Sequence, residues 1–304
     1  ALLNISLISC SFLLVPYMRE PELALAWGVL IAGFAQLFFQ LPFLRRINLL
    51  ASPKRSKSHE GVIWIGLEYR YMATISAALD NLEAVGDIRM FAIREHRFPF
   101  LKKVNNWNRF NRNTGGTLVE KCCHFFDLMR LLIGANPVQV MASGGQAFNH
   151  LDETYQGEVP DIWDHGYVIV DFANGARAML ELCMFAEGSQ FQEEISAVGP
   201  TGKIEAFVPG PTRFWRHPLH PAPDPKIVIS PRQDGLQEKI LLPVDPALLA
   251  AGDHNGSTFY QHQRFLAVVR QRHTVEVTLD DGIWAVRMGQ ATQRSATLKQ
   301  AVAL

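Results

Sequence analysis

The sequence predicts an α+β fold, in which helices cover one face of a mostly antiparallel sheet, with an apolar helical hairpin in front of it. Short apolar runs follow one another between residues 88 and 242, and Gly, Pro and Asn-Gly turns separate them. This pattern is typical of consecutive antiparallel strands. Segments with helical periodicity flank the runs, and the first 50 residues are mostly apolar.

The predicted hairpin occupies residues 1–50. No residue is charged from Leu23 to Leu44, and about 20 apolar residues are what a membrane-spanning helix requires. Residues 1–18 form a second, weaker apolar run. Basic residues follow from Arg45 onward, which by the positive-inside rule places that end in the cytoplasm. We therefore expect membrane contact through 1–50; the alternative is two buried helices of a soluble protein.

Residues 51–61 (ASPKRSKSHEG) are polar and basic and lack periodicity, so they indicate a linker to a second domain at 62–304. The chain holds 29 basic and 29 acidic residues, and this balance gives no bulk attraction to nucleic acid. Its 4 cysteines show no paired metal-ligand spacing. We therefore expect no nucleic-acid partner, no metal and a reducing, cytoplasmic compartment for 62–304.

The second domain is predicted to hold eight strands and three main helices. The strands are expected at 88–95, 138–142, 167–172, 176–185, 194–198, 204–208, 227–229 and 239–242. The helices are expected at 116–132, 257–272 and 280–295, packed on one face of the sheet.

The run GGTLVEKCCHFFD, which starts at Gly115, carries the clearest chemical pattern. A glycine turn opens a helix there, and Gly134 is placed to end it. Helical spacing aligns Glu120, His124 and Asp127 on one face. The opposite face is apolar, with Leu118, Cys122, Phe125, Met129 and Leu132. A histidine near a carboxylate suits proton transfer at neutral pH; the alternative is an ordinary pair on a solvated helix face.

The loop before this glycine turn offers groups that suit a sugar. Trp107, Arg109 and Asn111 bring an aromatic plate, a cation and an amide together, and Arg94 and Tyr167 are further candidates. Sugar rings stack on aromatic faces while polar side chains bond their hydroxyls. The alternative is that the two arginines only pair with carboxylates.

The same run resembles the segment that opens the substrate domain of the glucose-fructose oxidoreductase/inositol dehydrogenase (Gfo/Idh/MocA) family. Residues 164–187, 198–205 and 254–286 are similar to later segments of that domain, in the family's order. The resemblance implies oxidation of a sugar, cyclitol or similar polyol with NAD or NADP. It implies that His124 is the catalytic histidine and that Glu120 accepts a sugar hydroxyl or orients the histidine.

The resemblance also implies a homo-oligomer, formed through the free face of the sheet. We expect that face to carry apolar residues, namely Val168, Val170, Met179 or Leu182.

The sequence departs from the family in the part that binds the dinucleotide. No G-x-G-x-x-G run and no Glu-Lys-Pro motif is present. Val62–Gly66 resembles the last strand of the family's Rossmann domain, followed by a helix at about 74–85, so most of that domain is missing from the sequence. Residues 1–50 instead resemble a hairpin of the lipid II flippase family.

Two functions remain open on the sequence. The first is an NAD(P)-dependent oxidoreductase that is incomplete in this chain. The second is a non-catalytic, membrane-tethered binding or assembly module. The abrupt change near residue 51, together with the initial alanine, also fits a fusion or a fragment.

Overall fold

The computed structural model describes residues 62–304 except 216–220, 234 and 271–272. By its internal contacts the chain divides into two units, Ala1–Gly61 and Val62–Leu304. The predicted hairpin at 1–50 and the linker at 51–61 lie outside the described residues. Among the described helices, none is both long and apolar enough to cross a membrane.

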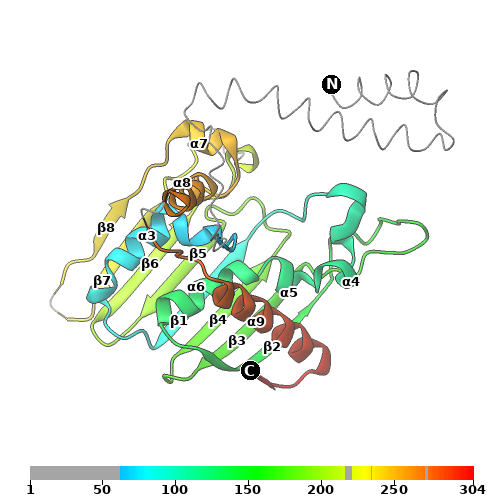
Figure 1. Cartoon of the computed structure of the whole chain (residues 1–304), viewed down its shortest axis with the longest axis horizontal. Helices are drawn as coiled ribbons and strands as arrows, with labels where there is room; N and C mark the ends of the chain where they lie inside the picture. Colours follow the sequence, from blue (N-terminus) through cyan, green and yellow to red (C-terminus); the bar gives the residue numbers. More distant parts are fainter. Residues whose placement is uncertain (1–61, 216–220, 234, 271–272) are drawn as a thin grey trace, which may run out of the picture. The chain divides into compact units, whose positions relative to one another are not determined.

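One mixed sheet forms the body of the second unit (Figure 1). Its nine strands in the described residues are β1 Met90–His96, β2 Pro137–Gly145, β3 His165–Phe172, β4 Arg177–Cys183, β5 Glu193–Val198, β6 Gly202–Val208, β7 Lys226–Pro231, β8 Glu238–Leu241 and β9 Val302–Ala303. They are ordered β8-β7-β6-β5-β1-β4-β3-β2-β9. Only β1 and β4 pair in parallel among the described strands, so the sheet is mostly antiparallel, as predicted.

The strands alternate between a face buried under helices and an open face. In β3, Val168 is buried while Ile169 is half exposed. The register pairs Val168 with Leu180 and Ile169 with Met179, so Met179 lies on the open face, as expected. The prediction that Val168, Val170 and Leu182 also lie there is wrong, because successive side chains on a strand point to opposite faces.

The helices gather on the buried face of the sheet (Figure 1). They are α3 Ala73–Asp80, α4 Asn111–Thr114, α5 Thr117–Glu120, α6 Cys123–Ile133, α7 Pro246–Ala251, α8 Ser257–Val269 and α9 Leu279–Leu298. Helix α9 packs on β2 and α6, and α3 packs on β6 and β7. The crossing of α5 and α9 is close, since a Cβ on Gly289 would lie 2.7 Å from the Leu118 carbonyl oxygen.

The helix predicted at 116–132 is two helices, α5 and α6, separated by a turn at Lys121 and Cys122. Its ends agree with the prediction. Gly116 begins it with φ 99°, and Gly134 ends it with φ 69°; both values favour glycine. The break falls between Glu120 and His124, so the two residues lie on different helices, which the sequence spacing did not predict.

The strand expected at Val62–Gly66 is absent, and this prediction is wrong for the described residues. Its only backbone hydrogen bond to another segment of the described chain runs from the Ile65 N–H to the Val277 carbonyl, at 3.2 Å. A strand requires a partner along its length, and none of the described strands pairs with this segment. The helix expected at 74–85 is α3, which ends at Asp80 and is followed by a 3-10 turn at Leu82–Ala84.

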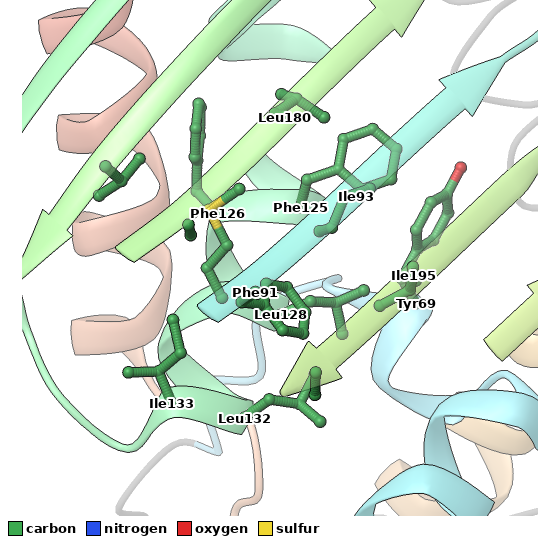
Figure 2. Packing of buried hydrophobic residues seen from close by; sticks show 14 of the residues in the cluster. Tyr69, Phe91, Ile93, Phe125, Phe126, Leu128, Leu132, Ile133, Leu180 and Ile195 are labelled. Atoms are coloured by element: carbon green, nitrogen blue, oxygen red, sulfur yellow. The ribbon is translucent and has the colours of Figure 1, made fainter. Parts of the chain in front are cut away.

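The main core lies between the sheet and helices α3, α6 and α9. Figure 2 shows Phe91 and Ile93 of β1 and Phe125 of α6 within it, close to Tyr69. All four side chains are nearly inaccessible to solvent. The hydroxyl of Tyr69 points away from the aliphatic part of the core in this view, and it accepts a hydrogen bond from Lys121.

Candidate functional site

The imidazole of His124 lies at the N-terminal end of α6, against the Tyr69 ring. The two ring centroids are 4.6 Å apart and the planes differ by 19°. The side chain keeps 18% of its exposure, but Nδ1 is buried and accepts or donates no hydrogen bond. Burial, reinforced by the positive charge of Lys121, lowers the pKa of His124 to about 3. The imidazole is therefore neutral at physiological pH.

Glu68 and His254 complete a polar group around the same tyrosine. A 3-10 helix, Glu68–Tyr71, places Glu68 beside both histidines. Its Oε2 lies 3.7 Å from His124 Nδ1, and its Oε1 lies 3.5 Å from His254 Nδ1. Burial raises the pKa of Glu68 despite a backbone hydrogen bond and the charge of Lys121. Burial, with Lys121, also lowers the pKa of His254 to about 4.

A buried charge cluster stands behind the Tyr69 ring. The Lys121 ammonium donates to the Tyr69 hydroxyl and lies 2.9 Å from Glu95 Oε1. Glu193 is buried beside this pair, and burial followed by repulsion from Glu95 raises the pKa of Glu193 to about 7. Lys121 therefore lies near two carboxyl groups. Its hydrogen bond to the Tyr69 hydroxyl holds the ring against which His124 stacks.

Glu120 is held by the loop that precedes the glycine turn. Its Oε1 accepts from Lys103 Nζ at 2.7 Å, while its Oε2 is buried without a hydrogen-bond partner. The same ammonium lies 4.8 Å from the centre of the Trp107 ring, which is 38% exposed. Glu120, Lys103 and Trp107 thus form one connected edge with an exposed aromatic plate.

Arg109 and Asn111 bind to protein groups within the same loop region. Arg109 is buried; its Nε donates to Glu153 at 2.7 Å, and it also donates to the Phe100 carbonyl. Asn111 donates through Nδ2 to the backbone carbonyl of Asp161 at 2.7 Å. These contacts match the alternative that was open for Arg109, in which the arginine pairs with a carboxylate, and they anchor the loop that carries Trp107.

The structure does not bring Arg94 and Tyr167 together with His124. Both lie on the open face of the sheet, in register with Glu181 of β4. Arg94 pairs with Glu181 at 3.2 Å and with Glu194 at 3.4 Å. Because side chains alternate along β1, Glu95, the residue after Arg94, points to the helix side. The candidate site is on that side.

Asp127 does not share a solvated stripe with Glu120 and His124. Its carboxylate is 1% exposed and receives two hydrogen bonds from Arg70, one of them from Nε at 2.6 Å. A buried, doubly bonded arginine-carboxylate pair ties α6 to the 3-10 helix that carries Glu68. We assign Asp127 the role of supporting the site from outside it.

The sequence argument missed Glu68, Tyr69, Lys121, Glu95 and His254. One signal was present for Glu95: it follows Phe91 and Ile93 at a spacing of two, which puts a carboxylate on the buried face of β1. A charged residue at a core position marks a special site. Glu68 and His254 carry no such local signal, because they meet only through the packing of distant segments.

The donor set does not support a metal or a dinucleotide. Within the described ranges, no group of three His, Cys, Asp or Glu side chains is placed to hold a metal ion. In the same part of the chain, no strand leads through a glycine-rich turn into a long helix, the arrangement that receives a pyrophosphate. The described residues therefore lack the turn on which the pyrophosphate of NAD or NADP usually rests.

Comparison with known protein families divides the chain into two parts. Residues 81–304 match the model described as "Oxidoreductase family, C-terminal alpha/beta domain" of Gfo/Idh/MocA proteins. Residues 1–78 match the lipid II flippase MurJ. Over 61 residues the chain is 44% identical to a probable lipid II flippase of Haemophilus influenzae, covering 20% of this chain and 12% of that protein. The corresponding protein of Vibrio cholerae is 41% identical over 63 residues, covering 21% and 12%.

Solved structures share the fold of the second unit. Levoglucosan dehydrogenase in complex with NADH and levoglucosan is 17% identical with a TM-score of 0.60, covering 80% of this chain and 66% of that chain. Aldose-aldose oxidoreductase from Caulobacter crescentus, complexed with glycerol, is 16% identical with a TM-score of 0.56, covering 93% and 68%. An oxidoreductase domain protein from Kribbella flavida is 16% identical with a TM-score of 0.61, covering 79% and 65%.

The chain spans 62% of a similar oxidoreductase from Thermotoga maritima, and only about an eighth of the flippases that match its first residues. The family match nevertheless covers well over half of the chain, and the sheet with its helices on one face has the same fold as these oxidoreductases. The chain therefore belongs to the Gfo/Idh/MocA oxidoreductase family, through the C-terminal α/β domain that it carries.

Proposed function

We propose that residues 62–304 are the substrate and proton-transfer half of an NAD(P)-dependent oxidoreductase that acts on a sugar, a cyclitol or a similar polyol. The observation that carries the proposal is the neutral, largely buried imidazole of His124 beside the Glu68 carboxyl group. Oxidation of an alcohol requires a group that removes the hydroxyl proton while a hydride leaves the carbon. A neutral imidazole has a free nitrogen for that proton.

The substrate class follows from Glu120 and from the loop before the glycine turn. Trp107 offers a partly exposed aromatic ring to a sugar, and the Glu120 oxygen without a hydrogen-bond partner offers an acceptor to a hydroxyl. Lys103 can donate to a further hydroxyl, since its ammonium already links these two residues. Levoglucosan and glycerol, named for two structural neighbours, belong to the same polyhydroxy chemistry.

The hydride acceptor must be held by another domain, because the described residues lack that glycine-rich turn. NAD or NADP is the expected acceptor by family. We propose that a nucleotide-binding domain outside this chain supplies it, and that residues 62–304 work in the cytoplasm.

The open sheet face supports a homo-oligomer. Met141, Tyr167, Ile169 and Met179 are all exposed there and lie on neighbouring strands. Such a row of apolar side chains is the kind of surface that a second copy covers. We further propose that residues 1–50 contact a membrane, which the flippase match supports.

Substitution of His124 in a protein with a nucleotide domain joined before Val62 tests the function. His124→Ala is expected to lower turnover of a polyol by roughly 100-fold or more, in line with the 10²–10⁴ of positioned acid-base groups. Glu120→Gln is expected to act mainly on substrate affinity. The matched control is His262→Ala, on the exposed part of α8. Unchanged turnover with His124→Ala would refute the proposal.

A titration of the unmodified chain tests the cofactor assignment independently. We expect no saturable binding of NAD or NADP at micromolar concentration, by calorimetry, because the pyrophosphate has no helix N-terminus to receive it. Micromolar binding would mean that this chain holds a dinucleotide site of a different design.

A further inference from the structure

Glu68 is placed between two histidines that face its two oxygens separately. The Oε2 atom faces Nδ1 of His124 at 3.7 Å, and the Oε1 atom faces Nδ1 of His254 at 3.5 Å. One carboxyl group thus faces two imidazoles, and each distance closes with a small side-chain movement or a bridging water. His254 is 35% exposed and His124 is 18% exposed. The series His124, Glu68, His254 therefore leads from the less exposed imidazole to the more exposed one.

The Tyr69 ring fixes this arrangement. It stacks on His124 at 4.6 Å and contacts His254 with ring centroids 5.4 Å apart. Tyr69 follows Glu68 directly in the 3-10 helix, and Lys121 holds its hydroxyl from behind. Both imidazoles are thus held on one aromatic plate beside the carboxyl group, and little side-chain entropy remains to be lost when the three groups make contact.

The buried Nδ1 of His124 is an unexplained polar atom. It has no hydrogen-bond partner in the structure, although a buried polar atom without a partner is costly. Glu68 Oε2 lies 3.7 Å from it. In the neutral imidazole one ring nitrogen carries a hydrogen and the other accepts. A hydrogen on Nδ1 would point toward Glu68 and leave Nε2 free for the substrate.

We propose that His124, Glu68 and His254 form a proton relay that carries the substrate proton from the covered imidazole to the solvent. The inference rests on the proposed function of His124. It adds two residues, Glu68 and His254, which act through His124 and do not touch the substrate.

The substrate O–H bond breaks and an N–H bond forms at Nε2 of His124, while its Nδ1–H bond breaks and the proton moves to Oε2 of Glu68. The Glu68 carboxylic acid releases the hydrogen on Oε1 to Nδ1 of His254. His254 then loses its Nε2 hydrogen to water. One proton enters and one leaves, and each group ends neutral.

Burial favours the neutral form of all three groups, whereas the positive charge of Lys121 favours neutral imidazoles but an ionised Glu68. Lys121 and Arg97 act on both histidines, and Asp253 acts on His254 in the opposite direction. Burial raises the pKa of Glu68 and lowers the pKa of both imidazoles. A carboxylic acid between two neutral imidazoles is the state that the relay requires at its start.

Nitrogen NMR of the full chain, labelled with ¹⁵N only in histidine, tests the relay without any turnover. When Glu68 loses its proton, the carboxylate should draw hydrogens onto Nδ1 of both rings. We expect the Nδ1 signal of His254 to move from the hydrogen-free to the hydrogen-bearing range, and the His124 signals to shift at the same pH. Signals are assigned with His124→Gln and His254→Gln.

Glu68→Gln should remove the shared inflection from both histidines. The control is Glu276→Gln, which changes a carboxylate bound to Tyr71 and Arg264 and should leave the inflection in place. The wild-type measurement stands even if Glu68→Gln fails to fold. Two histidines that respond at different pH values, or an inflection that survives in Glu68→Gln, would overturn the relay. Neither result would bear on whether His124 accepts the substrate proton.

Discussion

Asp127→Asn tests whether this carboxylate anchors the site or takes part in its chemistry. The pair with Arg70 is almost fully buried, with 9% and 1% of the two side chains exposed. Removing one charge of a buried pair typically costs about 3–5 kcal/mol, because the other charge stays buried without compensation. Asp281 remains 3.3 Å from Arg70 and compensates in part. We therefore expect the free energy of unfolding to fall by an amount near the lower end of this range, about 3 kcal/mol.

Urea unfolding of the full chain, followed by tryptophan fluorescence, measures this loss. With a denaturant slope of roughly 1–3 kcal/mol per molar urea, the midpoint should fall by about 1 M or more. The matched control is Asp280→Asn, because Asp280 is 70% exposed and pairs with Arg130 only at the surface. Its effect should stay within about 0.5 kcal/mol. An unchanged midpoint for Asp127→Asn would refute the anchoring role.

Three further predictions follow from single contacts and from the sequence. Burial raises the pKa of Glu153, but hydrogen bonds from its partners outweigh this and lower the pKa from 4.5 to about 2; stability should therefore fall as the pH drops from 4.5 toward 2, and Glu153→Gln should lack that fall in acid unfolding curves. Gly289→Ala places a Cβ 2.7 Å from the Leu118 carbonyl oxygen and should cost about 1–3 kcal/mol in thermal or urea unfolding, whereas Gly188→Ala meets nothing within 4 Å and should change little. Expressed with residues 1–50 the protein should sediment with membranes, and expressed without them it should not, so recovery of the full chain in the soluble fraction without detergent would contradict the membrane prediction.

The sequence by itself determined the order and type of most elements of the second unit. Apolar alternation located eight of the strands to within a few residues, because a period of two is written directly into neighbouring residues. The glycine turn and the end of α6 at Gly134 were also predicted, since a positive φ favours glycine wherever it occurs. His124 and Glu120 could be predicted as site residues because they closely follow this glycine turn.

Only the tertiary structure decided which side chains meet. Arg94 and Glu95 are neighbours in sequence, yet the pleat of β1 sends one to the open face and the other to Lys121. Glu68 and His254 lie far apart in the sequence of the second unit, and no local pattern connects them. They meet because α8, which begins just after His254, packs on the 3-10 helix that carries Glu68. Such contacts depend on the packing of distant segments, and local periodicity carries no information about them.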